Sequence, residues 1–180
     1  GAGLGTGARM EYEMVGGVYE LLAHVPLQRV VHENLETVGG VRYNPEEKAF
    51  AASISQTLGR PSLQDGLAAD IQSFKTESEP FASTDVGDVS FVVPTAGIRV
   101  ATWVPGTPAH SWQAVAAGGT SIGLKGMMVA AKTLAGTAIT LFKDPQAIRE
   151  AREEFLERRG DDFTYSPMLG DREPALDYRQ

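Results

Sequence analysis

The sequence contains no cysteine among its 180 residues. This absence excludes disulfide bonds, thiolate nucleophiles and zinc sites built from cysteine ligands. Any metal site in the chain must therefore use histidine, aspartate or glutamate side chains. A chain without cysteine also fits a reducing compartment, so a cytoplasmic location is expected.

Basic residues are scarce as well, with 16 lysines and arginines against 23 aspartates and glutamates and a net charge of -7. Binding to nucleic-acid phosphates requires clustered lysine and arginine, which the sequence lacks, so nucleic acid is not an expected partner. The N-terminus shows no basic segment followed by an apolar one, and no signal peptide is visible. The most apolar segment, residues 121–142, carries Lys125 and Lys132, which argues against a membrane span.

Alternating or continuous apolar patterns predict strands in three places. Met10, Tyr12 and Met14 alternate with charged residues, as in a strand with one buried face. The apolar runs 89–93 and 98–104 are each bounded by a proline, which is typical of short strands next to turns.

Helix signals occupy most of the remaining chain. Predicted helices cover residues 27–38, a segment capped by Asn44 and opened by Pro45, residues 121–142, and a last segment from Asp144 and Pro145 to Arg159. Residues 60–82 are predicted to form a loop with one short helix at 67–74, and the tail 161–180 to be irregular. His24 and His32 are expected to be surface or boundary histidines without chemistry. Because strands and helices interleave, the sequence predicts an α/β fold with helices on both faces of a sheet.

Acidic, hydroxyl and imidazole side chains gather in the segment 83–113. Asp85 and Asp88 lie on either side of Gly87, and His110 follows a turn rich in proline. A strand pair between them would fold the acidic loop toward the histidine, and this donor set suits a divalent cation with its bound water. The alternative is a packed, hydrogen-bonded histidine, which is common for a lone histidine near tryptophan.

Three segments of the sequence resemble motifs of a known family. They are Ser83-Thr84-Asp85-Val86-Gly87-Asp88-Val89-Ser90, Gly106-Thr107-Pro108-Ala109-His110-Ser111-Trp112-Gln113 and Gly123-Leu124-Lys125-Gly126-Met127. With these segments the chain resembles the C-terminal part of the metal-dependent aminoacylase/carboxypeptidase-like amidohydrolases, in the branch of the aminobenzoyl-glutamate hydrolase B subunit.

The resemblance implies a role for each part of this chain. Residues 1–15 would end a lid or dimerisation domain, and residues 16–180 would form the C-terminal part of a catalytic domain. His110 would bind one of two divalent ions, zinc or manganese. The residues expected to orient the substrate or the metal ligands are Ser83, Thr84, Asp85, Asp88, Gly106 and Thr107.

The resemblance also implies that this chain lacks part of the active site. Relatives are more than twice as long, and their other metal ligands and general-base glutamate would precede Gly1, so no catalytic residue is expected here and the chain alone should be inactive. The intact enzyme would hydrolyse an N-acyl or aminobenzoyl amino acid, as a homodimer or paired with a related subunit. Two alternatives stay open: a non-catalytic assembly or regulatory subunit, and a binding module with the same fold.

Overall fold

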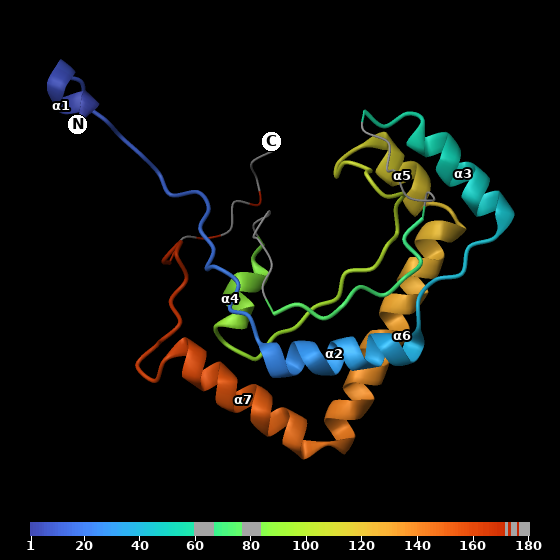
Figure 1. The fold of residues 1–180 in the computed structure, drawn as a ribbon. Helices are drawn as coiled ribbons and strands as arrows, with labels where there is room; N and C mark the ends of the chain where they lie inside the picture. The colour runs from blue at the N-terminus through green and yellow to red at the C-terminus, as the bar shows by residue number, and fades with distance from the viewer. Residues whose placement is uncertain (60–66, 77–83, 172, 174–175, 177–180) are drawn as a thin grey trace.

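The computed structural model describes residues 1–59, 67–76, 84–171, 173 and 176 (Figure 1). These residues form helices and contain no strand. The helices are α1 (Ala2–Thr6), α2 (Val25–Val38), α3 (Pro45–Ser55), α4 (Val86–Ser90), α5 (Trp112–Gly118), α6 (Ser121–Lys143) and α7 (Pro145–Arg159). The predicted α/β fold, with a sheet covered by helices on both faces, is therefore wrong for the described part of the chain.

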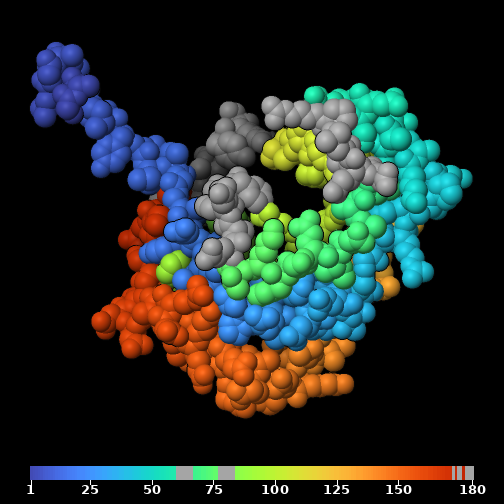
Figure 2. Space-filling view, viewed as in Figure 1, coloured from blue at the N-terminus to red at the C-terminus, as the bar shows by residue number. Residues whose placement is uncertain are grey.

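The three predicted strands fail for one physical reason, which is that a strand needs a neighbour to pair with. Residues 10–14 belong to a segment that stands away from the body of the molecule (Figure 2), and Tyr12 is 82% exposed. Residues 98–104 pair with no strand among the described residues. The run 89–93 is divided, because its first two residues end α4 and the others form a turn.

The predicted loop at 60–82 is only partly described. Residues 67–76 are irregular and contain no helix, so the short helix predicted at 67–74 is wrong. Residues 60–66 and 77–82 lie outside the described part.

The four longer helices are confirmed, with ends close to those predicted. In α3, the side chain of Asn44 accepts a hydrogen bond from the Glu47 backbone N–H (2.8 Å), and the Glu47 carboxylate accepts one from the Asn44 N–H (2.7 Å). This reciprocal capping box uses only residues three apart, so the sequence alone was sufficient to predict where the helix begins.

Helices α2, α6 and α7 contact one another (Figure 1). Their buried apolar residues are Leu27, Val31, Ile122, Ala147, Ala151 and Phe155. A buried apolar cluster joins α3 and α5 through Ala51, Ile54, Ala117 and Val104, which precedes α5. Helix α6 connects the two groups, since it contacts α2, α5 and α7.

Helix α6 was predicted to pack on a sheet, and it packs across α2 instead. Its residue Gly136 faces Asn34 of α2, and a Cβ at that position would come within 2.6 Å of the Asn34 side-chain oxygen. Among the described helices none is by itself long and apolar enough to cross a membrane; α5 and α6 meet that criterion only as a pair bent by 70°.

We expect Asp144→Ala to lower the free energy of unfolding by about 1 kcal/mol, because the substitution removes a helix cap. The Asp144 carboxylate accepts a hydrogen bond from the Gln146 N–H (2.9 Å) at the start of α7. Urea unfolding measures the change, with Asp162→Ala, at an exposed position outside any helix, as the control. Equal midpoints for the two variants would contradict the capping role.

Candidate functional site

Asp88 joins three segments that are far apart in the sequence. Its carboxylate accepts hydrogen bonds from the Tyr19 backbone N–H (3.1 Å) and from the Tyr165 hydroxyl (2.9 Å). The hydrogen bond to Asp88 raises the pKa of Tyr165 above its usual value, and burial adds to the effect. Since each carboxylate oxygen already accepts a hydrogen bond, Asp88 holds the N-terminal segment and the C-terminal tail onto α4.

The neighbours of Asp88 complete this docking of residues 19–22. A Cβ on Gly87 would overlap with the carbonyl oxygen of Tyr19, so only glycine permits the close approach. The hydroxyl of Ser90 accepts a hydrogen bond from the Leu22 N–H (2.9 Å) and donates one to the Gly87 carbonyl (2.6 Å). The conspicuous motif from Gly87 to Ser90 therefore has a structural role that sequence reasoning missed.

The other residues of the acidic segment are less constrained. Thr84 is exposed, and its hydroxyl accepts a hydrogen bond from the Val86 N–H (3.3 Å). Asp85 takes the N-cap position of α4, but its side chain makes no capping hydrogen bond. Ser83 lies outside the described residues.

A tight turn precedes His110. The Thr107 N–H donates to the Val104 carbonyl (3.1 Å), and Gly106 has a φ of 86°, as a type II turn requires after Pro105. The Thr107 hydroxyl oxygen is buried and has no hydrogen-bond partner among the described residues. The turn fixes the start of the loop that carries the histidine.

His110 itself adopts a left-handed backbone conformation, with a φ of 60°, and it is exposed. Among the described residues no other non-glycine residue has a positive φ. Ser111 follows as the N-cap of α5, where its hydroxyl accepts from the Ala114 N–H (3.2 Å) and donates to the Pro108 carbonyl (2.7 Å). Residues in this conformation are often found at functional sites, and the role of His110 as a site residue stays a prediction.

The structure does not assemble the predicted metal site. Figure 1 shows α4, which contains Asp88 and begins after Asp85, on the opposite side of the molecule from α5, which begins after His110 and Ser111. Within the described residues, no group of three or more histidines, aspartates or glutamates could hold a metal ion. A hydrolytic site needs about three protein ligands, and one imidazole does not meet that need. The described residues thus do not fit a complete metal centre, and the role of His110 as a ligand stays a prediction.

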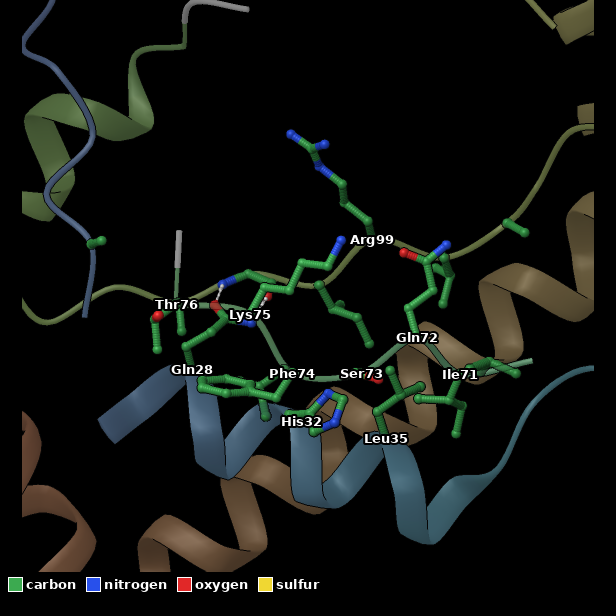
Figure 3. Close-up of a pocket in the computed structure, with 18 of the residues that line it drawn as sticks. Gln28, His32, Leu35, Ile71, Gln72, Ser73, Phe74, Lys75, Thr76 and Arg99 are labelled. Carbon is green, nitrogen blue, oxygen red and sulfur yellow. Dashed lines mark hydrogen bonds between the residues drawn. The ribbon is translucent and has the colours of Figure 1, made fainter. Parts of the chain in front are cut away.

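A groove of about 1080 Å³ lies between α2 and two extended segments, residues 68–76 and 95–101 (Figure 3). Apolar side chains form much of its wall: Leu21, Val31, Leu35, Ile71, Phe74, Ile98 and Val100. Its charged lining residues are Asp70, Lys75 and Arg99, and Thr84 also contributes. An apolar groove with a few polar groups is the usual form of a small-molecule site.

Phe74 holds the first extended segment against α2. Its ring lies 5.4 Å from the His32 ring and 4.6 Å from the Arg29 guanidinium carbon. Lys75, the next residue, and Arg99 extend away from α2 at the open side of the groove (Figure 3). This arrangement suits an apolar compound with an acidic end. No pattern in the sequence indicated it, because the two cations lie far apart in the chain.

Gln28 and His24 hold the second extended segment. The Gln28 amide donates to the Gly97 carbonyl (2.9 Å) and accepts from the Gly97 N–H (3.4 Å). His24 is buried, with Nδ1 3.1 Å from both the nitrogen and the carbonyl oxygen of Thr95. Burial lowers the pKa of His24, which favours the neutral ring. His24 therefore lies in the interior and not at the expected boundary.

Lys125, from the motif 123–127, fastens α6 to α3. Its ammonium donates to the Glu47 carboxylate (2.7 Å) and to the Arg42 carbonyl (2.9 Å), and the Ser121 hydroxyl donates to Glu47 as well (2.6 Å). The hydrogen bond from Lys125 is the main reason that the pKa of Glu47 falls to about 2. The lysine of this motif thus has a structural partner.

We expect Glu47→Gln to reduce the acid sensitivity of stability. The pKa of Glu47 is lower in the folded state than its ordinary value of 4.5. The ionised carboxylate therefore stabilises the fold fully above about pH 4.5, and this stabilisation is lost as the pH falls toward 2. Urea midpoints at about pH 5 and about pH 3 measure the effect, which should be smaller in Glu47→Gln than in the wild type. Glu46→Gln, at an exposed position on the same turn, is the control; equal pH sensitivity in all three proteins would contradict the expectation.

Comparison with known proteins identifies a relative. The B subunit of the p-aminobenzoyl-glutamate hydrolase of Escherichia coli (strain K12) is 33% identical to this chain over 178 residues, a match that covers 86% of the chain. The chain is related to this hydrolase subunit. The resemblance read from the sequence motifs is confirmed, and a hydrolase-related function is supported. The chain spans 37% of the length of this relative. No family model and no solved structure matches the chain.

Proposed function

We propose that this chain is part of an amidohydrolase that cleaves the amide bond of an N-acyl or aminobenzoyl amino acid. The observation that carries the proposal is the 33% identity to the B subunit of p-aminobenzoyl-glutamate hydrolase. The first substrate to test is therefore p-aminobenzoyl-glutamate. Because the match covers 37% of the relative, the complete active site would need polypeptide in addition to this chain, including the glutamate that acts as general base.

We also propose that the complete enzyme uses two divalent ions, zinc or manganese, with His110 as one ligand. The imidazole of His110 is exposed and follows the 104–107 turn. A metal ion that is also bound by other polypeptide could therefore reach it. The described residues place no group of three metal-binding side chains around it, so further ligands would come from the additional polypeptide.

The groove of Figure 3 is the proposed contact surface for the substrate. The substrate class combines an aromatic or aliphatic acyl group with one or more carboxylates. The apolar walls fit the acyl group, and Lys75 and Arg99 can pair with carboxylates. Thr84 lines the same groove, which is consistent with the expected substrate role of the acidic segment.

A hybrid enzyme tests the proposal directly. In this hybrid, the chain replaces the matched segment of the Escherichia coli relative, and the release of p-aminobenzoate from p-aminobenzoyl-glutamate is measured with zinc or manganese added. A folded hybrid that releases p-aminobenzoate supports the proposal. A folded but inactive hybrid, beside an active Escherichia coli enzyme, would favour the second candidate, a non-catalytic assembly role.

We expect the double variant Lys75→Ala/Arg99→Ala to bind p-aminobenzoyl-glutamate about 10-fold more weakly or worse, since hydrogen bonds to charged groups contribute about 1.5–3 kcal/mol. Calorimetric titration of the hybrid measures the change. The control is Lys48→Ala, which removes an exposed lysine of α3 that does not line the groove. Equal affinity in both variants would exclude the groove as the carboxylate site.

A further inference from the structure

The chain exposes far more surface than a compact protein of its size. Its accessible surface is 13315 Å². A compact monomer of 19.2 kDa exposes about 8,400 Å² by the usual scaling of area with mass. The excess of about 4,900 Å² is more than one partner contributes to most obligate interfaces, and the N-terminal segment that stands away from the body accounts for part of it.

Part of this excess forms one continuous apolar stripe on α6. The stripe consists of the exposed residues Leu124, Met127, Met128, Ala131, Leu134, Ala135, Ala138 and Phe142. They recur at helical spacing along the side of α6 opposite the buried residues Gly126, Thr133 and Thr137. Phe142 is 90% exposed, which is unusual for an aromatic residue without a partner.

The charges on α6 restrict the chemistry of a partner. The helix contains Lys125, Lys132 and Lys143 and no acidic residue. Lys125 is paired with Glu47, whereas Lys132 and Lys143 are exposed near the stripe. If two copies of α6 packed face to face, their lysines would lie close together, and neither helix has an acidic residue to pair with them. A partner with an apolar face and an acidic edge fits better.

We propose that the α6 stripe is the surface on which this chain packs against the rest of a hydrolase of this type, the region that corresponds to the unmatched 63% of the Escherichia coli relative. This inference rests on the proposed function and deepens it, because it names the face that joins the two parts. The excess area and the length of the relative point to the same partner: a large apolar surface is uncovered, and most of the homologous polypeptide lies outside the match.

Methionine oxidation tests the inference without any substitution. Met127 and Met128 lie on the stripe and are 53% and 47% exposed, while Met10 (71%) and Met168 (50%) lie outside α6 and serve as references. Oxidation by dilute peroxide follows exposure, so Met127 and Met128 should react about 10-fold more slowly in the hybrid enzyme than in the isolated chain. The references should react at similar rates in both. Peptide mass spectrometry after timed exposure gives each rate.

A second measurement uses the unmatched region of the Escherichia coli relative, produced together with this chain. The wild-type chain should purify with it in a fixed ratio, and Leu134→Glu should not. Ile148→Glu on α7 is the matched control, since Leu134 and Ile148 are 49% and 50% exposed. Both substitutions lie at exposed sites, and circular dichroism of the isolated variants checks that each still folds.

The outcomes separate this inference from the proposed hydrolysis. Protected methionines in an inactive hybrid support the surface and count against the enzyme. Unprotected methionines in a folded hybrid overturn the surface, whether or not the hybrid is active. An isolated chain that is dimeric in solution, with Met127 and Met128 protected, would assign the stripe to a second copy and also overturn the inference.

Discussion

Replacement of His110 by alanine is expected to lower the turnover of the hybrid enzyme at least about 10²-fold, because a lost metal ligand weakens both metal binding and water activation. The expectation rests on the match of the motif 106–113 and on the exposed, left-handed position of the histidine. Steady-state rates with added zinc or manganese measure the loss.

Two further variants separate the imidazole from the backbone. Glycine accepts a positive φ without cost, so His110→Gly should raise the free energy of unfolding by about 1 kcal/mol while turnover falls as in His110→Ala. His110→Asn keeps a residue that tolerates this conformation but removes the imidazole, and it should also be inactive. Turnover near the wild-type level in His110→Gly would reject the histidine as a ligand.

Gly126→Ala is expected to lower the free energy of unfolding by about 3 kcal/mol. A Cβ at this position would overlap with the carbonyl oxygen of Ala101 and would lie 2.9 Å from the Thr102 side chain. The obstacle is mainly backbone, which cannot move aside as a flexible side chain can. Residues 98–104 would have to leave α6, and they lead directly into the turn before His110.

Gly119→Ala is the matched control for this prediction. Gly119 has a φ of -79°, and a Cβ there would meet only the Val115 carbonyl oxygen at 3.5 Å, an ordinary contact. Urea unfolding of both variants should therefore show a large shift for Gly126→Ala and a small one for Gly119→Ala. Equal midpoints would mean that segment 98–104 does not pack on α6 as described.

The sequence was sufficient for features that depend on neighbouring residues. The capping box of Asn44 and Glu47 and the cap at Asp144 involve residues two or three positions apart, so they could be predicted directly. Strands depend on partners elsewhere in the chain, which is why an apolar run such as 98–104 was misjudged. The fold class was wrong because it rested on those strands.

The predicted metal site was not found for the same reason, because the contacts of its residues are made with distant parts of the chain. The composition around Asp88 suggested a cation ligand, yet its carboxylate accepts hydrogen bonds from Tyr19 and Tyr165, at sequence distances of 69 and 77 residues. The left-handed backbone of His110 could not be predicted from the residue type, because histidine is enriched in that conformation but most histidines do not adopt it. The resemblance to the family located the segment 83–113. Only the structure showed that Asp88 has a structural role there, separate from that predicted for His110.

The aromatic contacts around Tyr19 make residues 15–23 and the segment after Gly160 dependent on each other. The Tyr19 ring lies 5.9 Å from that of Phe163, and the Tyr19 hydroxyl donates to the Ser166 carbonyl (3.0 Å). A protease that removed the tail after Gly160 would therefore also loosen residues 15–23 at the other end of the sequence. A form that lacks the segment after Gly160 should therefore lose protection from proteolysis at residues 15–23 as well, and a shorter form made for crystallisation would be destabilised there.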